Sequence, residues 1–186
     1  MKIACITTIA AGPYLFTRVE TEDGIVGLGE AGDWAHLEAV RSEINRLAAY
    51  FIGKDPRQVE HHWQYTQRST FFRSSVLLST IASIDIALWD IKAKALGVPV
   101  YEFFGGSTRN KVRSYAVAMG ETPDEIAASC RHVKELGFDA VRVILPSFKN
   151  AELAAKDHIF NRRVATAIDK VLACREAVGS DFDLCV

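Results

Sequence analysis

The chain has 186 residues, of which 49% are hydrophobic and 24% charged, enough for one sizeable core or two small domains. Its 22 lysine and arginine residues are scattered among 23 aspartate and glutamate residues, so the composition excludes a strongly basic surface for nucleic acid. No stretch approaches the ~20 consecutive apolar residues of a membrane span, and the four cysteines have no metal-binding or disulfide spacing. We therefore expect a cytoplasmic protein without a nucleic-acid or membrane partner, whose cysteines are small core residues.

Residues 1–34 are predicted to form antiparallel β structure. The stretches KIACITTIA and YLFTRVET have the composition of strands, and TEDGIVGLGE predicts a hairpin in which Asp23 and Gly24 supply positive φ angles. The opening MKIACITTIAAG has the outline of a signal peptide, but Thr7 and Thr8 interrupt a short apolar run, so a strand is favoured.

The stretch GLGEAG, Gly27 to Gly32, matches the G-x-G-x-x-G pattern of dinucleotide-binding loops. Such a loop follows a buried parallel strand and precedes an acidic residue about 20 positions later. Here the preceding strand belongs to a polar hairpin, and the later region reads RLAAYFIG. We do not expect a nucleotide site.

Three helices are predicted next. HLEAVRSEINRLAAYFIG has apolar residues at helical spacing, and DPRQVEHHWQYTQ is expected to start with Asp55 as its cap and Pro56 in its first turn. The third, SSVLLSTIASIDIALWDIKAKALG, is capped by Ser74 or Ser75 and ends at Gly97. The strands and helices together predict an α+β domain.

The remaining residues alternate strands with helices. The strands are KVRSYAVAM, FDAVRVIL and DFDLCV, and the helices are TPDEIAASCRHVKELG and NRRVATAIDKVLACREAVG. Thr122 and Glu125 predict a capping box at the start of the first helix. This order predicts parallel strands joined by right-handed crossovers. The three strands are either the start of a (β/α)8 barrel, which needs about 250 residues, or a small open sheet. In the second helix, one inward side is expected to carry Val164, Ile168, Val171 and Val178.

Charged and histidine side chains of the helices are better explained by structure than by catalysis. Asp85 and Asp90 lie about 140° apart on a helix and do not converge on one substrate atom. Asp90 is expected to pair with Lys94, and Asp85 to tie its helix to a loop. His61 and His62 are adjacent in the chain, so we expect surface or interface positions rather than a shared ligand.

Three positions carry candidate binding groups. Trp34 and His36 follow the hairpin and either pack or face a ligand cavity. Arg142 is placed near the carboxyl end of its strand, where side chains of a barrel reach the active site. Its guanidinium either binds an acidic substrate or neutralises neighbouring carboxylates.

Four stretches taken together resemble the enolase superfamily in its mandelate-racemase-like branch. They are VETEDGIVGLGEA, ASIDIALWDIKAKALGVPVYEFFGG, GFDAVRV and VLACREAVGSDFDLCV. Within the branch, the chain is most similar to the D-galactonate-dehydratase type of sugar-acid dehydratase. The resemblance implies a capping domain over residues 1–108 and a (β/α)8 barrel that begins at residue 109 and is truncated here after its third strand.

The resemblance also implies a chemistry. Mg²⁺, held by carboxylates at the ends of the third, fourth and fifth barrel strands, stabilises the ene-diolate formed when the proton α to a carboxylate is removed. Loss of the β-hydroxyl then gives a 2-keto-3-deoxy acid. The first metal-binding aspartate would follow Val186 directly, so no catalytic or metal-binding residue is assigned within the chain. The 186-residue chain alone is predicted to be inactive, and the intact enzyme to be a homo-oligomer.

The resemblance implies four substrate-binding candidates, which are Trp34, His36 and Arg73 in the capping domain and Arg142 in the barrel mouth. Arg142-Val143-Ile144 stands where racemases and cycloisomerases of the branch have Lys-x-Lys, which disfavours those reactions. Val117 stands where mannonate dehydratases have a histidine. The alternative is a non-catalytic, shortened relative that acts as a binding or assembly module by pairing its 181–186 strand with another chain.

Overall fold

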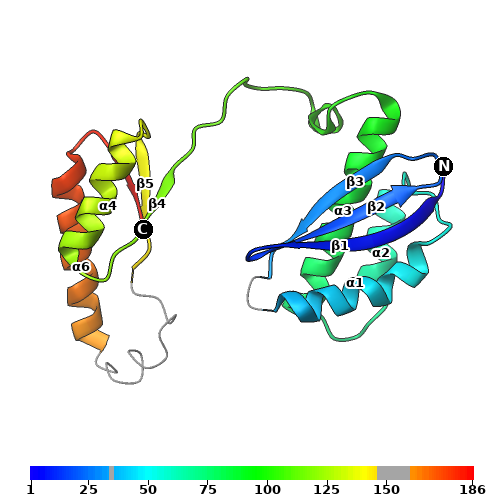
Figure 1. Ribbon diagram of the computed structural model, residues 1–186, viewed down its shortest axis with the longest axis horizontal. Coiled ribbons are helices and arrows are strands. Elements are labelled where there is room, and N and C mark those ends of the chain that lie inside the picture. The colour runs from blue at the N-terminus through cyan, green and yellow to red at the C-terminus, as the bar shows by residue number, and fades with distance from the viewer. Residues whose placement is uncertain (34–35, 146–159) are drawn as a thin grey trace. The chain divides into compact units, whose positions relative to one another are not determined.

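The structure, a computed structural model, describes residues 1–33, 36–145 and 160–186. The chain forms two compact units, Met1–Thr108 and Arg109–Val186, each with its own hydrophobic core (Figure 1).

Unit 1 combines a three-stranded antiparallel sheet, in the order β1-β2-β3, with three α-helices and a short 3₁₀-helix (Figure 1). On β2, Leu15, Thr17 and Val19 are buried while the residues between them are less so, which is the alternation expected of a strand with one covered face. The elements are β1 (Ile3–Ala11), β2 (Tyr14–Thr21), β3 (Val26–Ala31), α1 (Leu37–Phe51), α2 (Val59–Arg68), α3 (Ser75–Leu96) and η1 (Val100–Phe104).

The glycines of GLGEAG allow β3 to approach the backbone of α3. A Cβ atom added at Gly29 would lie 1.8 Å from the carbonyl oxygen of Ser83, and one at Gly27 would lie 2.1 Å from that of Ala87. Beside this contact, the Thr17 hydroxyl donates to the Ser83 hydroxyl at 2.9 Å. The glycine pattern therefore serves sheet-to-helix packing.

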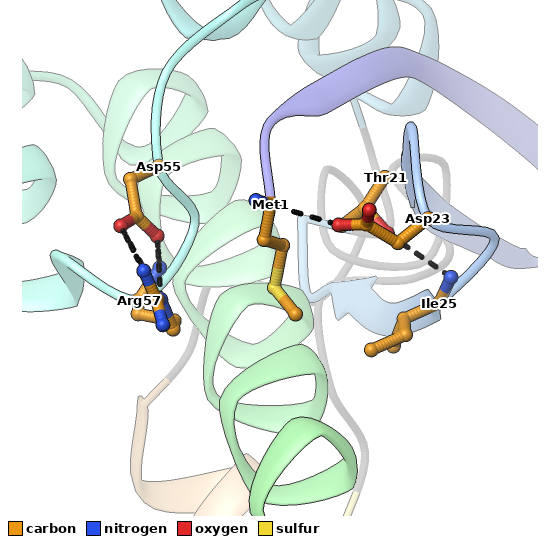
Figure 2. A network of polar contacts seen from close by, with 6 residues as sticks. All are labelled: Met1, Thr21, Asp23, Ile25, Asp55 and Arg57. Atoms are coloured by element: carbon orange, nitrogen blue, oxygen red, sulfur yellow. Dashed lines mark hydrogen bonds and ion pairs between the residues drawn. The ribbon is translucent and has the colours of Figure 1, made fainter.

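The turn between β2 and β3 is closed by side-chain contacts (Figure 2). Thr21 Oγ1 accepts a hydrogen bond from the backbone N–H of Ile25 at 3.0 Å, and the Met1 ammonium lies 3.4 Å from Asp23 Oδ2. Gly24 has a φ of 82°, but no described residue other than glycine has a positive φ, so the prediction of a positive φ was right for Gly24 and wrong for Asp23.

The boundaries of α3 confirm the sequence signals, whereas α2 starts later than predicted. Ser74 caps α3 by accepting from the N–H of Leu77, and Gly97 ends the helix in the left-handed region. α2 begins at Val59 rather than near Asp55. Asp55 accepts instead from the N–H of Arg57 at 2.9 Å and pairs with its guanidinium, which holds a turn ahead of the helix (Figure 2).

Unit 2 is a three-stranded parallel sheet in the order β4-β5-β6, with helices that pack on one of its faces (Figure 1). The capping box predicted from Thr122 and Glu125 is present at the start of its first helix. Val141 and Val143 are buried in the helix-covered core, while Arg142 between them is exposed. The elements are β4 (Ala116–Ala118), α4 (Pro123–Glu135), β5 (Ala140–Val143), α6 (Phe160–Val178) and β6 (Asp183–Cys185).

The inward face of α6 differs from the prediction. Val178 is buried as expected, but Val164 and Ile168 are exposed. Their inward places are taken by Cys174 and Lys170, and the Lys170 ammonium donates to the carbonyl oxygen of Gly120 at 3.1 Å.

The cysteines are not all core residues. Cys130 and Cys174 are fully buried in the core of unit 2, and burial raises the pKa of Cys130 to about 12. Cys5 is only partly buried and Cys185 is exposed, so the prediction was right for two of the four.

Candidate substrate-binding surfaces

Arg142 lies on the sheet face of unit 2 that α4 and α6 leave bare. The parallel register pairs Val117 with Arg142 and Arg142 with Cys185, so these three exposed side chains form one row across the sheet. Arg142 is the third of the four residues of β5, near the carboxyl end of the strand. The carboxyl ends of parallel strands are where α/β proteins place their ligands.

A second arginine of unit 2 has a structural role that separates it from Arg142. Arg113 Nε donates to Asp139 Oδ1 at 3.0 Å, and its Nη1 pairs with the carboxylate of Asp183. These residues lie at the amino ends of β5 and β6, so Arg113 ties neighbouring strands together there. Arg142 has no hydrogen-bond or ion-pair partner among the residues that the structure describes, which leaves its guanidinium available to a carboxylate.

In unit 1, the predicted binding residues His36 and Arg73 lie at the same end of the domain. His36 directly precedes α1, and Arg73 directly precedes the cap residue of α3. The first turns of both helices contribute to one apolar cluster, through Leu37 and Val76. The side chains of His36 and Arg73 are both exposed. Trp34 lies outside the described residues.

Two residues close to His36 in the sequence each have a buried polar atom without a partner among the described residues. Asp33 Oδ2 and Arg41 Nε are buried, and neither has a hydrogen-bond partner among the described residues. The imidazole of His36 does not cap α1, although its backbone N–H donates to the carbonyl oxygen of Asp33 at 3.1 Å. Buried polar atoms of this kind are normally paired, and the Arg41 guanidinium does pair through another nitrogen with Glu38 at 3.4 Å.

Two phenylalanines beside Arg73 were missed by the sequence reasoning. Phe71 and Phe72 have relative exposures of 101% and 92%, so both rings are in water. An exposed aromatic pair marks a contact surface more often than isolated exposed residues do. The signal in the sequence is TFFRSS, two adjacent aromatic residues inside an otherwise polar loop.

The predictions for the helical acids and histidines of unit 1 had mixed outcomes. Asp90 pairs with Lys94 at 2.7 Å, as expected. No loop contact of Asp85 is seen among the described residues, and burial raises its pKa, with a further rise from Glu60. His61 is exposed, but His62 is buried and hydrogen-bonded, so a surface position was wrong for His62.

Neither a metal site nor a membrane span is found in the part of the chain that the structure describes. No group of three or more histidine, cysteine, aspartate or glutamate side chains among residues 1–33, 36–145 and 160–186 could hold a metal ion. No helix over the same residues is long and apolar enough to cross a membrane.

Comparison with known proteins assigns the chain to a family. Residues 1–105 match the family described as "Mandelate racemase / muconate lactonizing enzyme, N-terminal domain". The chain belongs to this family, and its similarity to enolase-superfamily proteins extends over both units.

Two curated relatives show how far the similarity reaches. A D-galactonate dehydratase of Pectobacterium atrosepticum is 38% identical over 187 residues, which cover 98% of this chain and 47% of that protein. A D-galactonate dehydratase of Xanthomonas campestris pv. campestris is 40% identical over 185 residues, with the same two coverages. The chain thus spans about half the length of these relatives.

Solved structures agree with this assignment. A member of the enolase superfamily from Salmonella Typhimurium has a TM-score of 0.85 and 29% identity, over 98% of this chain and 53% of that one. An enolase from Pantoea ananatis with bound D-gluconate and Mg has a TM-score of 0.81 and 27% identity, over 98% and 52% of the two chains.

Proposed function

We propose that this chain provides the capping domain and the first three barrel strands of an acid-sugar dehydratase. The reaction would remove the proton α to a carboxylate and eliminate the β-hydroxyl. The names of the relatives support this class, because they are dehydratases of a sugar acid. The observation that carries the proposal is Arg142, whose guanidinium lies on the sheet face that α4 and α6 leave open and has no hydrogen-bond or ion-pair partner among the described residues.

Arg142 is suited to one part of the proposed reaction, the binding of the substrate carboxylate. Its planar guanidinium can bind the two oxygens of a substrate carboxylate through parallel hydrogen bonds. Such binding fixes the position of the adjacent α-carbon and offsets the negative charge that develops on the carboxylate when the α-proton leaves. His36 and Arg73, with Trp34, are the substrate-binding residues proposed for the capping domain.

Mg²⁺ is the proposed cofactor on the strength of the family relationship, and one similar structure carries Mg with D-gluconate. The described residues of this chain do not fit a Mg²⁺ site, because they contain no cluster of carboxylates. The ligands, the general base and the general acid are therefore proposed to lie outside these residues, as is the remainder of the barrel. The 186-residue chain alone is proposed to be inactive.

The test is an assay of 2-keto-3-deoxy acid formation from D-galactonate and D-gluconate with Mg²⁺. The protein encoded by the complete gene is expected to be active and the 186-residue chain inactive. In the active protein, Arg142→Met should lower kcat/KM by about 10- to 150-fold, the loss expected for one hydrogen-bonded charge contact. Its melting temperature should stay unchanged.

Arg113→Met is the matched control, since it removes an arginine of the same unit that lies just before β4. It should lower stability, because Asp139 and Asp183 lose their shared partner. The kcat/KM of the folded variant should stay within a few-fold of the parent value. Full activity in the Arg142→Met variant would contradict the proposed role of Arg142.

Homo-oligomeric assembly of the intact enzyme stays a proposal, as does the non-catalytic alternative. That alternative requires a partner that covers the sheet edge at residues 181–186. Sequencing the gene past the codon for Val186 separates the two functions. A continuation that carries further carboxylate-bearing strands favours the enzyme, and a stop codon there would refute it for this protein.

A further inference from the structure

The exposed side of α2 carries a hollow that none of the predicted substrate-binding residues lines. Its volume is about 470 Å³, and its lining consists of His61, Gln64, Tyr65, Arg68 and Ser69. The hollow is shallow and largely open to solvent, although its volume lies within the range of roughly 300 to 1,000 Å³ that small-molecule sites occupy. His61, Tyr65 and Arg68 stand at i, i+4 and i+7, so they share one face of the helix.

The aromatic wall of the hollow is held in place from behind. The Tyr65 ring stacks on Tyr50 with 3.9 Å between centroids and 8° between planes. The Tyr50 hydroxyl donates to His62 Nδ1 at 3.1 Å, and His62 Nε2 donates to the carbonyl oxygen of Asp55 at 2.8 Å. Tyr65 is thus fixed before a ligand arrives, which lowers the entropic cost of binding.

The polar groups of the hollow favour an anion that also has hydroxyl groups. Arg68 has no hydrogen-bond or ion-pair partner among the described residues, and no carboxylate lines the hollow. The amide nitrogen of Gln64 donates to Glu60 at 2.6 Å, which leaves the amide oxygen free to accept. The lining therefore combines a cationic donor, an aromatic ring and a neutral acceptor.

We propose that this hollow binds a small hydroxylated carboxylate. The carboxylate would pair with the Arg68 guanidinium, a C–H face of the ligand would lie on the Tyr65 ring, and one hydroxyl would donate to the Gln64 amide oxygen. The site consists of α2 and its C-terminal cap residue only, so it is independent of Arg142 and of the proposed reaction. The competing explanation is that Arg68, in the last turn of α2, only complements the helix dipole.

The test is a titration of the ¹⁵N-labelled 186-residue chain with D-gluconate, followed by backbone amide chemical shifts. Amides of residues 61–69 are expected to shift saturably, with a Kd on the order of 1 mM. Sorbitol, which lacks the carboxylate, and acetate, which lacks the hydroxyl groups, should not give saturable shifts at the same concentrations. Arg68→Met should weaken binding at least about tenfold, which corresponds to one charge-assisted contact.

Arg131→Met is the control, because Arg131 is an exposed arginine on α4 in the other unit. This variant should bind D-gluconate with the affinity of the parent chain. Gln64→Leu keeps the charge of the hollow and removes the acceptor, and it should weaken D-gluconate binding several-fold. This variant tests the proposed site even if Arg68→Met unfolds the chain. The proposal is overturned by an absence of saturable shifts, by equal binding of acetate, or by parent-like affinity in both variants of the hollow. A lower melting temperature of Arg68→Met with no ligand binding in the parent chain would assign Arg68 to the helix dipole alone.

Discussion

His62 is a titratable side chain in the core of unit 1, with 1% of its surface exposed. The atom next to its Nε2 is a carbonyl oxygen, which can only accept, so Nε2 carries the proton. Nδ1 is then the acceptor for the Tyr50 hydroxyl. The neutral ring is satisfied at both nitrogens, and burial lowers the pKa of His62 because it disfavours the charged ring.

The stability of the chain should therefore fall on mild acidification. The folded-state pKa of His62 is below the unfolded value of about 6.5, so below that pH the unfolded chain binds more protons than the folded chain. The free energy of unfolding should decrease from about pH 7 towards pH 5, by at most about 1.4 kcal/mol per pH unit, and this contribution should level off below the folded-state pKa. Urea unfolding at several pH values in this range measures the slope.

His62→Gln supplies the control, because the amide does not titrate. Asp85 acts in the opposite sense: its pKa is raised in the folded state, so its contribution to stability grows as the pH falls. Both proteins contain Asp85, so the difference between their slopes isolates His62. Asp55, with a pKa lowered to about 2, contributes only at more acidic pH. Equal slopes for the two proteins would contradict the assignment.

At the scale of elements, the contact between β3 and α3 depends on the absence of side chains. Gly29→Ala would place a methyl group against backbone atoms of Ser83, which cannot rotate away. The strand must move off the helix, and we expect a loss of at least about 3 kcal/mol in the free energy of unfolding, at the upper end of overpacking costs. Chemical unfolding, followed by the far-UV signal, measures the loss.

Gly32→Ala is the matched control within the same GLGEAG stretch. No atom lies within 4 Å of the Cβ position at Gly32, and the residue does not have a positive φ. Its stability should change by no more than about 0.5 kcal/mol. A similar loss in both variants would show that local flexibility, rather than helix packing, explains the glycines.

The elements that the sequence predicts well are those with local signals. Ser74, Gly97 and the Thr122 capping box each act within a few residues, and the structure confirms them. The start of α2 was missed because Asp55 can cap a helix or close a turn with equal ease, and its contact with His62 selects the turn.

The inward face of α6 was missed for a different reason. Apolar periodicity cannot show which apolar side meets this sheet, and the stem of Lys170 packs inward while its ammonium reaches the Gly120 carbonyl oxygen. At the candidate site, Arg142 could be found from its place in a strand. Its row with Val117 and Cys185 depends on the register between distant strands, which the sequence does not state.

At the scale of the whole molecule, unit 2 has two exposed surfaces that parallel-sheet proteins normally cover. One is the sheet face around Arg142, since parallel sheets are generally buried on both faces. The other is a ridge on α6 whose members follow each other at intervals of four residues and are all exposed: Phe160, Val164, Ile168 and Leu172. Ridges of this spacing are what neighbouring helices pack against. If the chain continued after β6 through a right-handed crossover to a further parallel strand, the connecting helix would lie on the same side of the sheet as α6.

This geometry makes the effect of one substitution depend on the length of the protein. In the 186-residue chain, Ile168→Lys should change the free energy of unfolding by no more than about 0.5 kcal/mol, because Ile168 is half exposed on a bare ridge. It should also reduce the binding of a dye such as ANS, which the bare apolar surfaces of the parent chain are expected to bind. In a longer protein whose next helix covers the ridge, the same lysine would be buried without a partner and should cost several kcal/mol.

Unfolding of the parent and Ile168→Lys forms at both lengths measures this difference, and Arg131→Lys serves as a substitution that should be neutral at either length. Small and equal effects of Ile168→Lys in both proteins would mean that no helix packs on the ridge, and the barrel proposed for the longer protein would then have to leave α6 uncovered. A large effect in the short chain alone would instead mean that copies of the chain already cover the ridge by associating, which sedimentation at two concentrations would reveal. Only a cost confined to the longer protein fits a sheet that continues beyond β6.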